Sequence, residues 1–244
     1  MVTYTTLKLN PRKFLALTGL SSGEFDLLLP PFLRAYESLY LPDQTLDGRP
    51  RRRFPGGGRH GSLYPRDQKL MFILVYIKTY PLQVVLGELF GLSQPQVNHW
   101  VHRLLPVLRS ALDDVGALPD RDAAHFSRKW PLPGQEPRLI IDGTERRRQR
   151  PKNPEKQREY YSGKKKTHTD KNVVVVDAQE QCIAFLSRTY PGKTHDKKVA
   201  DEAEISYPPG AVLYKDTGFQ GYEPAVKKTC QAKKKATPRG THRR

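Results

Sequence analysis

Apolar residues near the start of the chain recur at helical spacing. Between residues 7 and 40 they fall three or four positions apart, as on the buried face of an amphipathic helix. Pro30-Pro31 interrupts this pattern, and proline both removes a backbone donor and clashes with the preceding turn. We therefore expect two helices here, with inward positions at Leu15, Leu20, Phe25, Leu28, Leu29, Phe32, Leu33 and Tyr36.

Three more helices are predicted between residues 65 and 108. The first begins at Pro65, because a first helical turn tolerates proline. The second covers residues 82–90 and ends at Gly91, a residue type that favours the C-terminal cap. Ser93 and Gln96 have the spacing of a capping box at the start of the third. The predicted buried faces are Leu70, Ile73, Leu74 and Ile77 in the first helix and Val97, Val101, Leu104, Leu105 and Leu108 in the third.

A helix, a glycine-containing turn and a second helix are typical of the helix-turn-helix, whose last helix enters the major groove of DNA. We place this unit at about residues 65–109. Gln and Asn side chains can pair with adenine, and Arg with guanine or phosphate. The alternative is a three-helix packing unit whose polar residues only face water. The candidate DNA-binding residues on the outer side of the last helix are Gln94, Gln96, Asn98, His99, His102 and Arg103.

The pattern changes after residue 112. Residues 113–137 are polar and rich in proline, which predicts a linker. Short apolar runs then predict strands, and four consecutive valines favour a strand covered on both faces. The predicted strands cover residues 138–142, 172–177, 182–187 and 211–215, with a helix over residues 194–204. The expected organisation is a helical domain over residues 1–112, the linker, a sheet domain over residues 138–228 and a basic, disordered tail over residues 229–244.

The charge balance points to a polyanionic partner. The 244 residues include 42 Lys and Arg against 25 Asp and Glu, which leaves a formal charge of +17. Nucleic acid is the commonest such partner, with anionic membranes or acidic proteins as alternatives. The longest apolar run, residues 70–77, is too short to span a bilayer. Two cysteines are too few for a disulfide scaffold or a thiolate zinc site. We therefore expect a cytoplasmic protein associated with the nucleoid rather than with a membrane.

Two predicted strands end in a carboxylate that is followed at once, or nearly so, by glycine. These are Asp142-Gly143 and Asp216-Thr217-Gly218. Acids at the ends of neighbouring strands can meet, and paired carboxylates suit Mg²⁺ or Mn²⁺. Two such ions can support phosphodiester cleavage. Asp-Gly is also a frequent turn dipeptide, so each aspartate taken alone is better explained as a turn residue than as a metal ligand.

Four ordered motifs resemble the bacterial insertion-sequence transposases of the DDE superfamily, in the branch related to Harbinger elements. They are Asp142-Gly-Thr-Glu145, Tyr161-Ser-Gly-Lys-Lys-Lys166 with His168, Tyr190-Pro-Gly-Lys-Thr-His-Asp196 and Lys215-Asp-Thr-Gly-Phe-Gln-Gly-Tyr222. The likeness covers about residues 62–228. It implies an α+β or α/β chain, in which a ribonuclease H-like mixed sheet follows the helix-turn-helix domain. It also implies that Asp142 and Asp216 are the first two catalytic, metal-binding acids.

The resemblance also implies partners: double-stranded DNA at the element ends and at the target, with transposases generally working as homo-oligomers. Asp196 belongs to the family pattern, and it either lies near the metal or caps the helix that follows. Glu145 is expected to face away from the metal and to pair with an arginine. If the basic segments around the first acid form a hairpin beside it, they would hold the DNA backbone, whereas the alternative is a solvated basic hairpin. These basic residues are Arg146, Arg147, Arg148, Lys164, Lys165 and Lys166.

The family's triad ends in a glutamate on a later helix. Glu223 is the one acid after Asp216, and it lies too close to the fourth motif, which ends at Tyr222, to be that residue. We therefore expect the ribonuclease H-like domain to be incomplete at its C-terminal side, through frameshifting or decay of the gene. Two functions stay open: a transposase that cuts DNA and transfers strands, inactive if the third acid is missing, and a non-catalytic DNA-binding regulator derived from one. A structural or RNA-associated basic protein would explain the charge but not the motifs.

Overall fold

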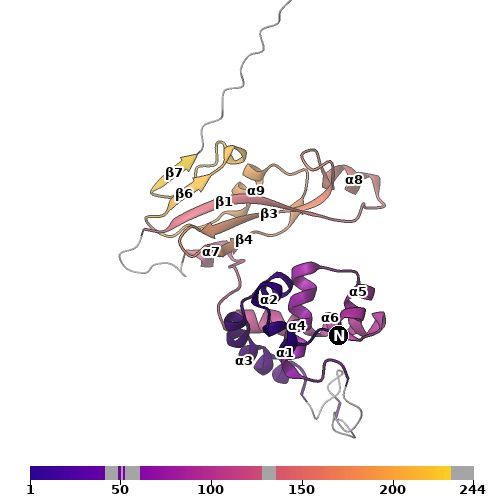
Figure 1. Cartoon of the computed structure of the whole chain (residues 1–244). Coiled ribbons are helices and arrows are strands. Elements are labelled where there is room, and N and C mark those ends of the chain that lie inside the picture. Colours follow the sequence, from indigo (N-terminus) through magenta and orange to yellow (C-terminus); the bar gives the residue numbers. More distant parts are fainter. Residues whose placement is uncertain (42–48, 51, 53–60, 128–135, 232–244) are drawn as a thin grey trace, which may run out of the picture. The chain divides into compact units, whose positions relative to one another are not determined.

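The computed structural model describes residues 1–41, 49–50, 52, 61–127 and 136–231. The chain divides into two compact units, Met1–Leu118 and Pro119–Arg244, each with its own hydrophobic core (Figure 1). The first unit is helical and the second is built on a sheet, which confirms the α+β class. Within the described ranges, no helix has the length and apolar character needed to cross a membrane.

Six helices make up the described part of the first unit. They pack around a core rich in phenylalanine, in which the rings of Phe14, Phe25, Phe32, Phe72 and Phe90 are all buried. Asn10 and Ser21 supply side-chain caps that begin two of these helices, because their oxygens satisfy backbone donors at a helix start. The helices are α1 (Tyr4–Lys8), α2 (Pro11–Thr18), α3 (Ser22–Leu39), α4 (Arg66–Thr79), α5 (Gln83–Phe90) and α6 (Gln94–Asp114).

The expected break at Pro30-Pro31 is wrong. Helix α3 continues through both prolines, and the break lies earlier, at Gly19, whose φ of 78° ends α2 in the left-handed conformation. An internal proline costs about 3 kcal/mol or more. The same helix buries Phe25 and Phe32, and each buried side chain of this size contributes about 1.5–3 kcal/mol. Residues 7–40 therefore lie in three helices rather than two.

The helix-turn-helix geometry of the first unit follows its local signals. Gly91 ends α5 with a φ of 66°, and the Ser93 N–H donates to the Gln96 Oε1 at 2.9 Å in the capping box of α6. Both signals are thereby confirmed. The predicted apolar faces are less accurate, since Ile77 is 49% and Leu105 37% exposed, whereas Val107 lies in the core. Helix α4 is buried more widely than one stripe, from Leu70 through Val75.

Gly87 gives a test of how α5 approaches the turn before α6. A Cβ added there would lie 2.4 Å from the main-chain oxygen of Leu92, so Gly87→Ala is expected to destabilise the protein by about 1–3 kcal/mol. The matched control is Gly23→Ala in α3, where nothing lies within 4 Å of the added atom. That change should be neutral or slightly stabilising, because alanine favours helix over glycine. Urea unfolding measures both, and equal effects would contradict this packing.

Seven strands form one mixed sheet in the described part of the second unit. Their order is β2-β3-β1-β6-β7, with β4 and β5 also paired to β3. Strand β1 is antiparallel to β3 and parallel to β6, and β6 is parallel to β7. This topology is consistent with the expected ribonuclease H-like fold. The strands are β1 (Arg138–Arg147), β2 (Tyr161–Ser162), β3 (Thr167–Asp177), β4 (Ile183–Leu186), β5 (Tyr190–Pro191), β6 (Val212–Lys215) and β7 (Lys228–Gln231).

One face of the sheet is fully buried and the other is partly open. Alternate residues of β1, β3 and β6 share the second core with Val199 and Ala200 of helix α9 (Asp196–Ala203). Side chains on the opposite face are more accessible, with Ile140 41% and Tyr214 39% exposed. Val174 and Val176 are half-buried, so the valine strand is covered completely on one face only, not on both.

The structure differs from the expected domain boundaries in two places. Helix α7 (Ala123–Phe126) lies inside the segment expected as a linker, and Phe126 is buried in the second core. The division between the units, at Leu118 and Pro119, also falls inside that segment. Strand β7 includes residues 229–231, which were assigned to the tail, because they pair with β6. Residues 232–244 of the expected tail lie outside the described part of the chain.

Candidate active site and nucleic-acid interface

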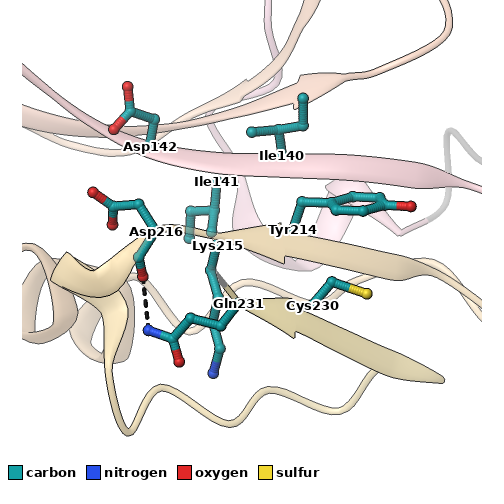
Figure 2. A pocket seen from close by; sticks show the side chains of 8 residues that line it. All are labelled: Ile140, Ile141, Asp142, Tyr214, Lys215, Asp216, Cys230 and Gln231. Carbon is teal, nitrogen blue, oxygen red and sulfur yellow. Dashed lines mark hydrogen bonds between the residues drawn. The ribbon is translucent and has the colours of Figure 1, made fainter. Parts of the chain in front are cut away.

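Asp142 and Asp216 lie side by side at the end of one parallel ladder. The pairing of β1 with β6 ends at Ile141 opposite Lys215, and each acid is the next residue of its chain segment. Both acids are exposed and line one open pocket, and Figure 2 shows their carboxyl groups on the same side of it. Strand β1 continues past Asp142 to Arg147, so this acid lies within a strand and not at its tip. The pocket is also lined by Ile140, Ile141, Tyr214, Lys215, Cys230 and Gln231.

Backbone donors orient both carboxylates. The Gly143 N–H donates to Asp142 Oδ1 at 2.7 Å, and the Gly218 N–H donates to Asp216 Oδ1 at 2.8 Å. Asp216 is also the N-cap of the short helix η1 (Thr217–Phe219), and Gln231 holds its main-chain oxygen at 2.8 Å (Figure 2). Within the described residues, the second oxygen of each carboxylate accepts no hydrogen bond. Each acid therefore keeps one oxygen for a ligand.

A third carboxylate, that of Asp196, lies close to this pair but is already bound. Its Oδ1 is 2.9 Å from the Nζ of Lys171, a residue only 6% exposed that also donates to the Thr194 main-chain oxygen at 2.7 Å. Asp196 is not the helix cap, because the N-cap of α9 is His195. The cap alternative for Asp196 is therefore corrected.

Glu145 pairs with the same lysine and not with an arginine. Its Oε1 is 3.5 Å from Lys171 Nζ, and its Oε2 accepts from Thr169 at 2.9 Å. Burial alone would raise the pKa of Glu145. The hydrogen bonds from Ser162 and Thr169 and the charge of Lys171 outweigh burial and lower it. Glu145 is thus a buried anion on the covered face of the sheet.

The two exposed acids fit a hard divalent cation that is shared with a substrate. Carboxylate oxygens are the ligands that Mg²⁺ and Mn²⁺ prefer, and Mg²⁺ commonly takes one or two protein carboxylates plus phosphate oxygens. Among the described residues, no three His, Cys, Asp or Glu side chains converge as a metal-binding group. In this arrangement of the described residues, Asp196 does not converge with Asp142 and Asp216 on one point. The donor set suits a divalent ion that further oxygen ligands help to hold.

Five of the six candidate DNA-binding residues in the helix-turn-helix are exposed on α6: Gln94, Gln96, Asn98, His99 and His102. Two of these five also have structural partners. Gln94 donates to the Gln83 side chain at 2.7 Å, and Gln96 completes the capping box. Asn98, His99 and His102 are therefore the exposed candidates that take no part in these two contacts.

Arg103 does not face outward as predicted. It is half-buried, and its guanidinium lies 4.1 Å from the ring centre of Tyr40 and 5.6 Å from that of Trp100. A cation over an aromatic face is attracted by the ring quadrupole. Its position on α6 turns it toward α3, whose contacts with α6 are extensive. We therefore assign Arg103 to helix packing and not to base contacts.

Lys69 lies beside Arg103 and gives the first unit a pH-dependent stability. Burial, then the charges of Arg103 and Arg66, lower the pKa of Lys69 to about 8. In the unfolded chain this lysine keeps its proton to a higher pH, so between pH 8 and 10 the unfolded state binds more protons. The free energy of unfolding is therefore expected to rise with pH in this window. Lys69→Met should remove that rise, and parallel curves for the two proteins would contradict it.

The basic segments do form a hairpin, but its turn is remote from the acids. Lys164, Lys165 and Lys166 are exposed in the turn between β2 and β3. Thr167, where β3 begins, lies seven residues before Val174, the partner of Asp142. At about 3.3 Å per residue this is roughly 23 Å. The condition that the hairpin lies beside the acids is therefore not met at its lysine turn, because β1 and β3 are longer than their apolar runs.

The arginines at the end of β1 and directly after it differ in how many contacts their side chains make. Arg146 donates to the Asn172 side chain at 3.0 Å, and Arg148 pairs with Asp170 at 2.8 Å. Arg148 also lies over the ring of Tyr160, 3.8 Å from its centre. Arg147 is exposed. Arg146 and Arg148 are therefore engaged within the second unit, and Arg147 is the candidate whose side chain is exposed without such a contact among the described residues.

Comparison with known proteins agrees with this arrangement. Residues 141–243 match the family described as DDE superfamily endonuclease, and residues 61–114 match the helix-turn-helix of DDE superfamily endonuclease. Over 223 residues the chain is 26% identical to a probable transposase for insertion sequence element IS702 from Microchaete diplosiphon, covering 88% of this chain and 68% of that protein. No solved structure matches the chain.

Proposed function

Because the chain belongs to the DDE superfamily of endonucleases, we propose that it is a DNA transposase that cuts the ends of an insertion sequence and joins them to a target. The observation that carries this proposal is the pair Asp142 and Asp216, which line one pocket where the parallel ladder ends. The helix-turn-helix supports it, since a cleaving enzyme of this kind must select its ends.

Each part of the chain has a role in this proposal. Asp142 and Asp216 would hold Mg²⁺ or Mn²⁺ through their second oxygens, while Gly143 and Gly218 fix the first oxygens. The cation, when bound, would stabilise charge on the phosphate that is cut. Asn98, His99 and His102 would contact base edges, and the lysine turn would contact the DNA backbone. The protein would work on cytoplasmic, nucleoid DNA, as a homo-oligomer that brings two ends together.

Nicking of DNA tests this function directly. The full chain is incubated with a supercoiled plasmid that carries the DNA flanking its gene, in Mg²⁺ or Mn²⁺ and, separately, in a chelator. We expect nicks within the flanking sequence that require the ion. A plasmid of the same length without the flanks is the control. Binding to the flanks without nicks in either ion would overturn the enzymatic proposal.

One observation favours a second candidate, a DNA-binding regulator without cleavage activity. Among the described residues, no three metal-ligating side chains converge, and loss of one oxygen ligand weakens a hard-cation site. A regulator would protect the flanking DNA from nuclease digestion equally well with or without Mg²⁺. Ion-dependent nicking at the same sites would exclude this candidate.

A further inference from the structure

The carboxylate of Asp196 fills the space beside two glycines, one next to each candidate acid. A Cβ built on Gly143 would lie 2.6 Å from Asp196 Oδ1 and 3.2 Å from Oδ2. A Cβ built on Gly218 would lie 3.2 Å from the same Oδ2. Real Cβ atoms do not approach an oxygen at 2.6 Å, so Asp196 can occupy this place only while residue 143 has no side chain.

These glycines are the residues whose N–H groups orient the two acids. Gly143 donates to Asp142 at 2.7 Å, and Gly218 donates to Asp216 at 2.8 Å. A shift of either backbone would therefore turn the carboxylate bound to it. One side chain, that of Asp196, is thus in contact with both donor segments, which belong to β1 and to the segment after β6.

Lys171 holds Asp196 in this place. Its Nζ contacts Asp196 Oδ1 at 2.9 Å, Glu145 Oε1 at 3.5 Å and the Thr194 main-chain oxygen at 2.7 Å. Lys171 is 6% exposed, and a buried ion pair of this kind is costly to break because the remaining partner keeps an unpaired charge. Lys171 therefore ties together three elements: β1, its own strand β3 and the start of α9.

We propose that Asp196, held by Lys171, is a positioning residue that sets the separation of the Asp142 and Asp216 carboxylates through Gly143 and Gly218. The effect of Asp196 on metal binding rests on the proposed function. The contact of Asp196 with the two glycines does not depend on that function. It explains the glycine directly after Asp142, which leaves room for the Asp196 carboxylate, whereas a Cβ at Gly218 would crowd Asp216 Oδ1 at 3.0 Å as well as Asp196 Oδ2 at 3.2 Å. It also gives Asp196 a role other than that of a third metal ligand.

The geometric part is tested by stability measurements without any metal. Gly143→Ala is expected to lower the melting temperature of the full chain, because the added atom displaces Asp196. In an Asp196→Ala background the same change should cost little or nothing, because the space is clear and glycine is unfavourable inside a strand. Gly163→Ala, with nothing within 4 Å of the added atom, is the control and should behave alike in both backgrounds. An equal loss from Gly143→Ala in both backgrounds would overturn the proposal.

The effect on the acids is tested by titrating the full chain with Mn²⁺ and detecting the bound ion by electron paramagnetic resonance. Asp196→Asn and Lys171→Met should each weaken Mn²⁺ binding by about 10- to 100-fold, as is typical when a residue that supports a metal ligand is lost. If Asp196 were instead a direct metal ligand, the two variants should change Mn²⁺ affinity in opposite directions. Asp196→Asn would weaken binding, whereas Lys171→Met would free the Asp196 carboxylate and strengthen binding. Stronger binding in Lys171→Met would therefore overturn the proposal.

Two exposed residues of α9 provide matched controls for the titration. Asp201→Asn removes a carboxylate that pairs with Lys197, and Lys198→Met removes an exposed lysine near Glu202. Neither should change Mn²⁺ affinity. If the unchanged protein binds no Mn²⁺ that depends on Asp142 and Asp216, the proposed function fails, whereas the stability cycle still decides the positioning role. The Mn²⁺ affinity of Lys171→Met is interpreted only if its near-ultraviolet circular dichroism matches that of the unchanged protein. If the spectra differ, the Mn²⁺ affinity of Asp196→Asn decides the test.

Discussion

Replacement of Asp142 or Asp216 by asparagine is expected to reduce ion-dependent nicking by at least about a hundredfold. A bound cation contributes several kcal/mol of transition-state stabilisation, and each 1.4 kcal/mol is about tenfold in rate. Asparagine keeps the size of the side chain and an oxygen that can accept the glycine N–H, but it removes the charge that attracts the ion. The measurement is the initial rate of plasmid nicking in Mg²⁺ and in Mn²⁺.

The binding of DNA separates loss of chemistry from loss of folding in these variants. Both should bind the flanking DNA as tightly as the unchanged protein, because the acids lie in the second unit and the helix-turn-helix in the first. Asp201→Asn, an exposed change in α9, should nick normally. If either active-site variant nicks at more than about a tenth of the normal rate, that acid does not hold the catalytic ion.

Exchange of the three turn lysines for glutamine should weaken DNA binding and, above all, its dependence on salt. Each phosphate contact that is lost lowers the slope of log K against log salt concentration by about 0.9 on duplex DNA. If Lys164, Lys165 and Lys166 all contact phosphates, the slope should fall by roughly 2.7. Their exposure in the turn between β2 and β3 makes such contacts possible without disturbing the core.

A charge-retaining variant serves as the control for this experiment. Arginine at the same three positions keeps the positive charge and should keep the slope. The glutamine variant should also lose affinity to the same extent for flanking and for unrelated DNA, since phosphate contacts carry no sequence information. An unchanged slope would show that the lysine turn is solvated and takes no part in binding.

The helices and strands were predictable where one local signal was decisive. Gly91 and the Ser93–Gln96 box have fixed geometry, and both stand where the sequence places them. Pro30-Pro31 misled because the burial of Phe25 and Phe32 outweighs the local penalty. The predicted strands β1 and β3 were too short, because their outer halves carry charged residues and show no apolar run. These halves are strands because their backbones pair with each other, with Arg146 opposite Asp170 in the ladder, and such pairing is a tertiary property.

The two acids of the candidate site were predictable from the sequence, but the buried residues that contact the segments around them were not. Asp142 and Asp216 stand at neighbouring positions because each follows an apolar run of a paired strand. Lys171 was missed, although it alternates with the buried Val173 and Val175 along β3. This alternation indicates that Lys171 is buried only once β3 is known to begin at Thr167. Arg103 was misplaced because helical periodicity alone does not show that Tyr40 lies beside it.

The central claim is that Asp142 and Asp216 share one cation in the presence of DNA. The most direct measurement is the anomalous diffraction of Mn²⁺ in crystals of the full chain bound to flanking DNA. We expect a manganese peak within coordination distance of one oxygen from each carboxylate, with a phosphate oxygen as a further ligand. A peak that touches only one of the two acids, or manganese bound only elsewhere on the protein, would contradict the account.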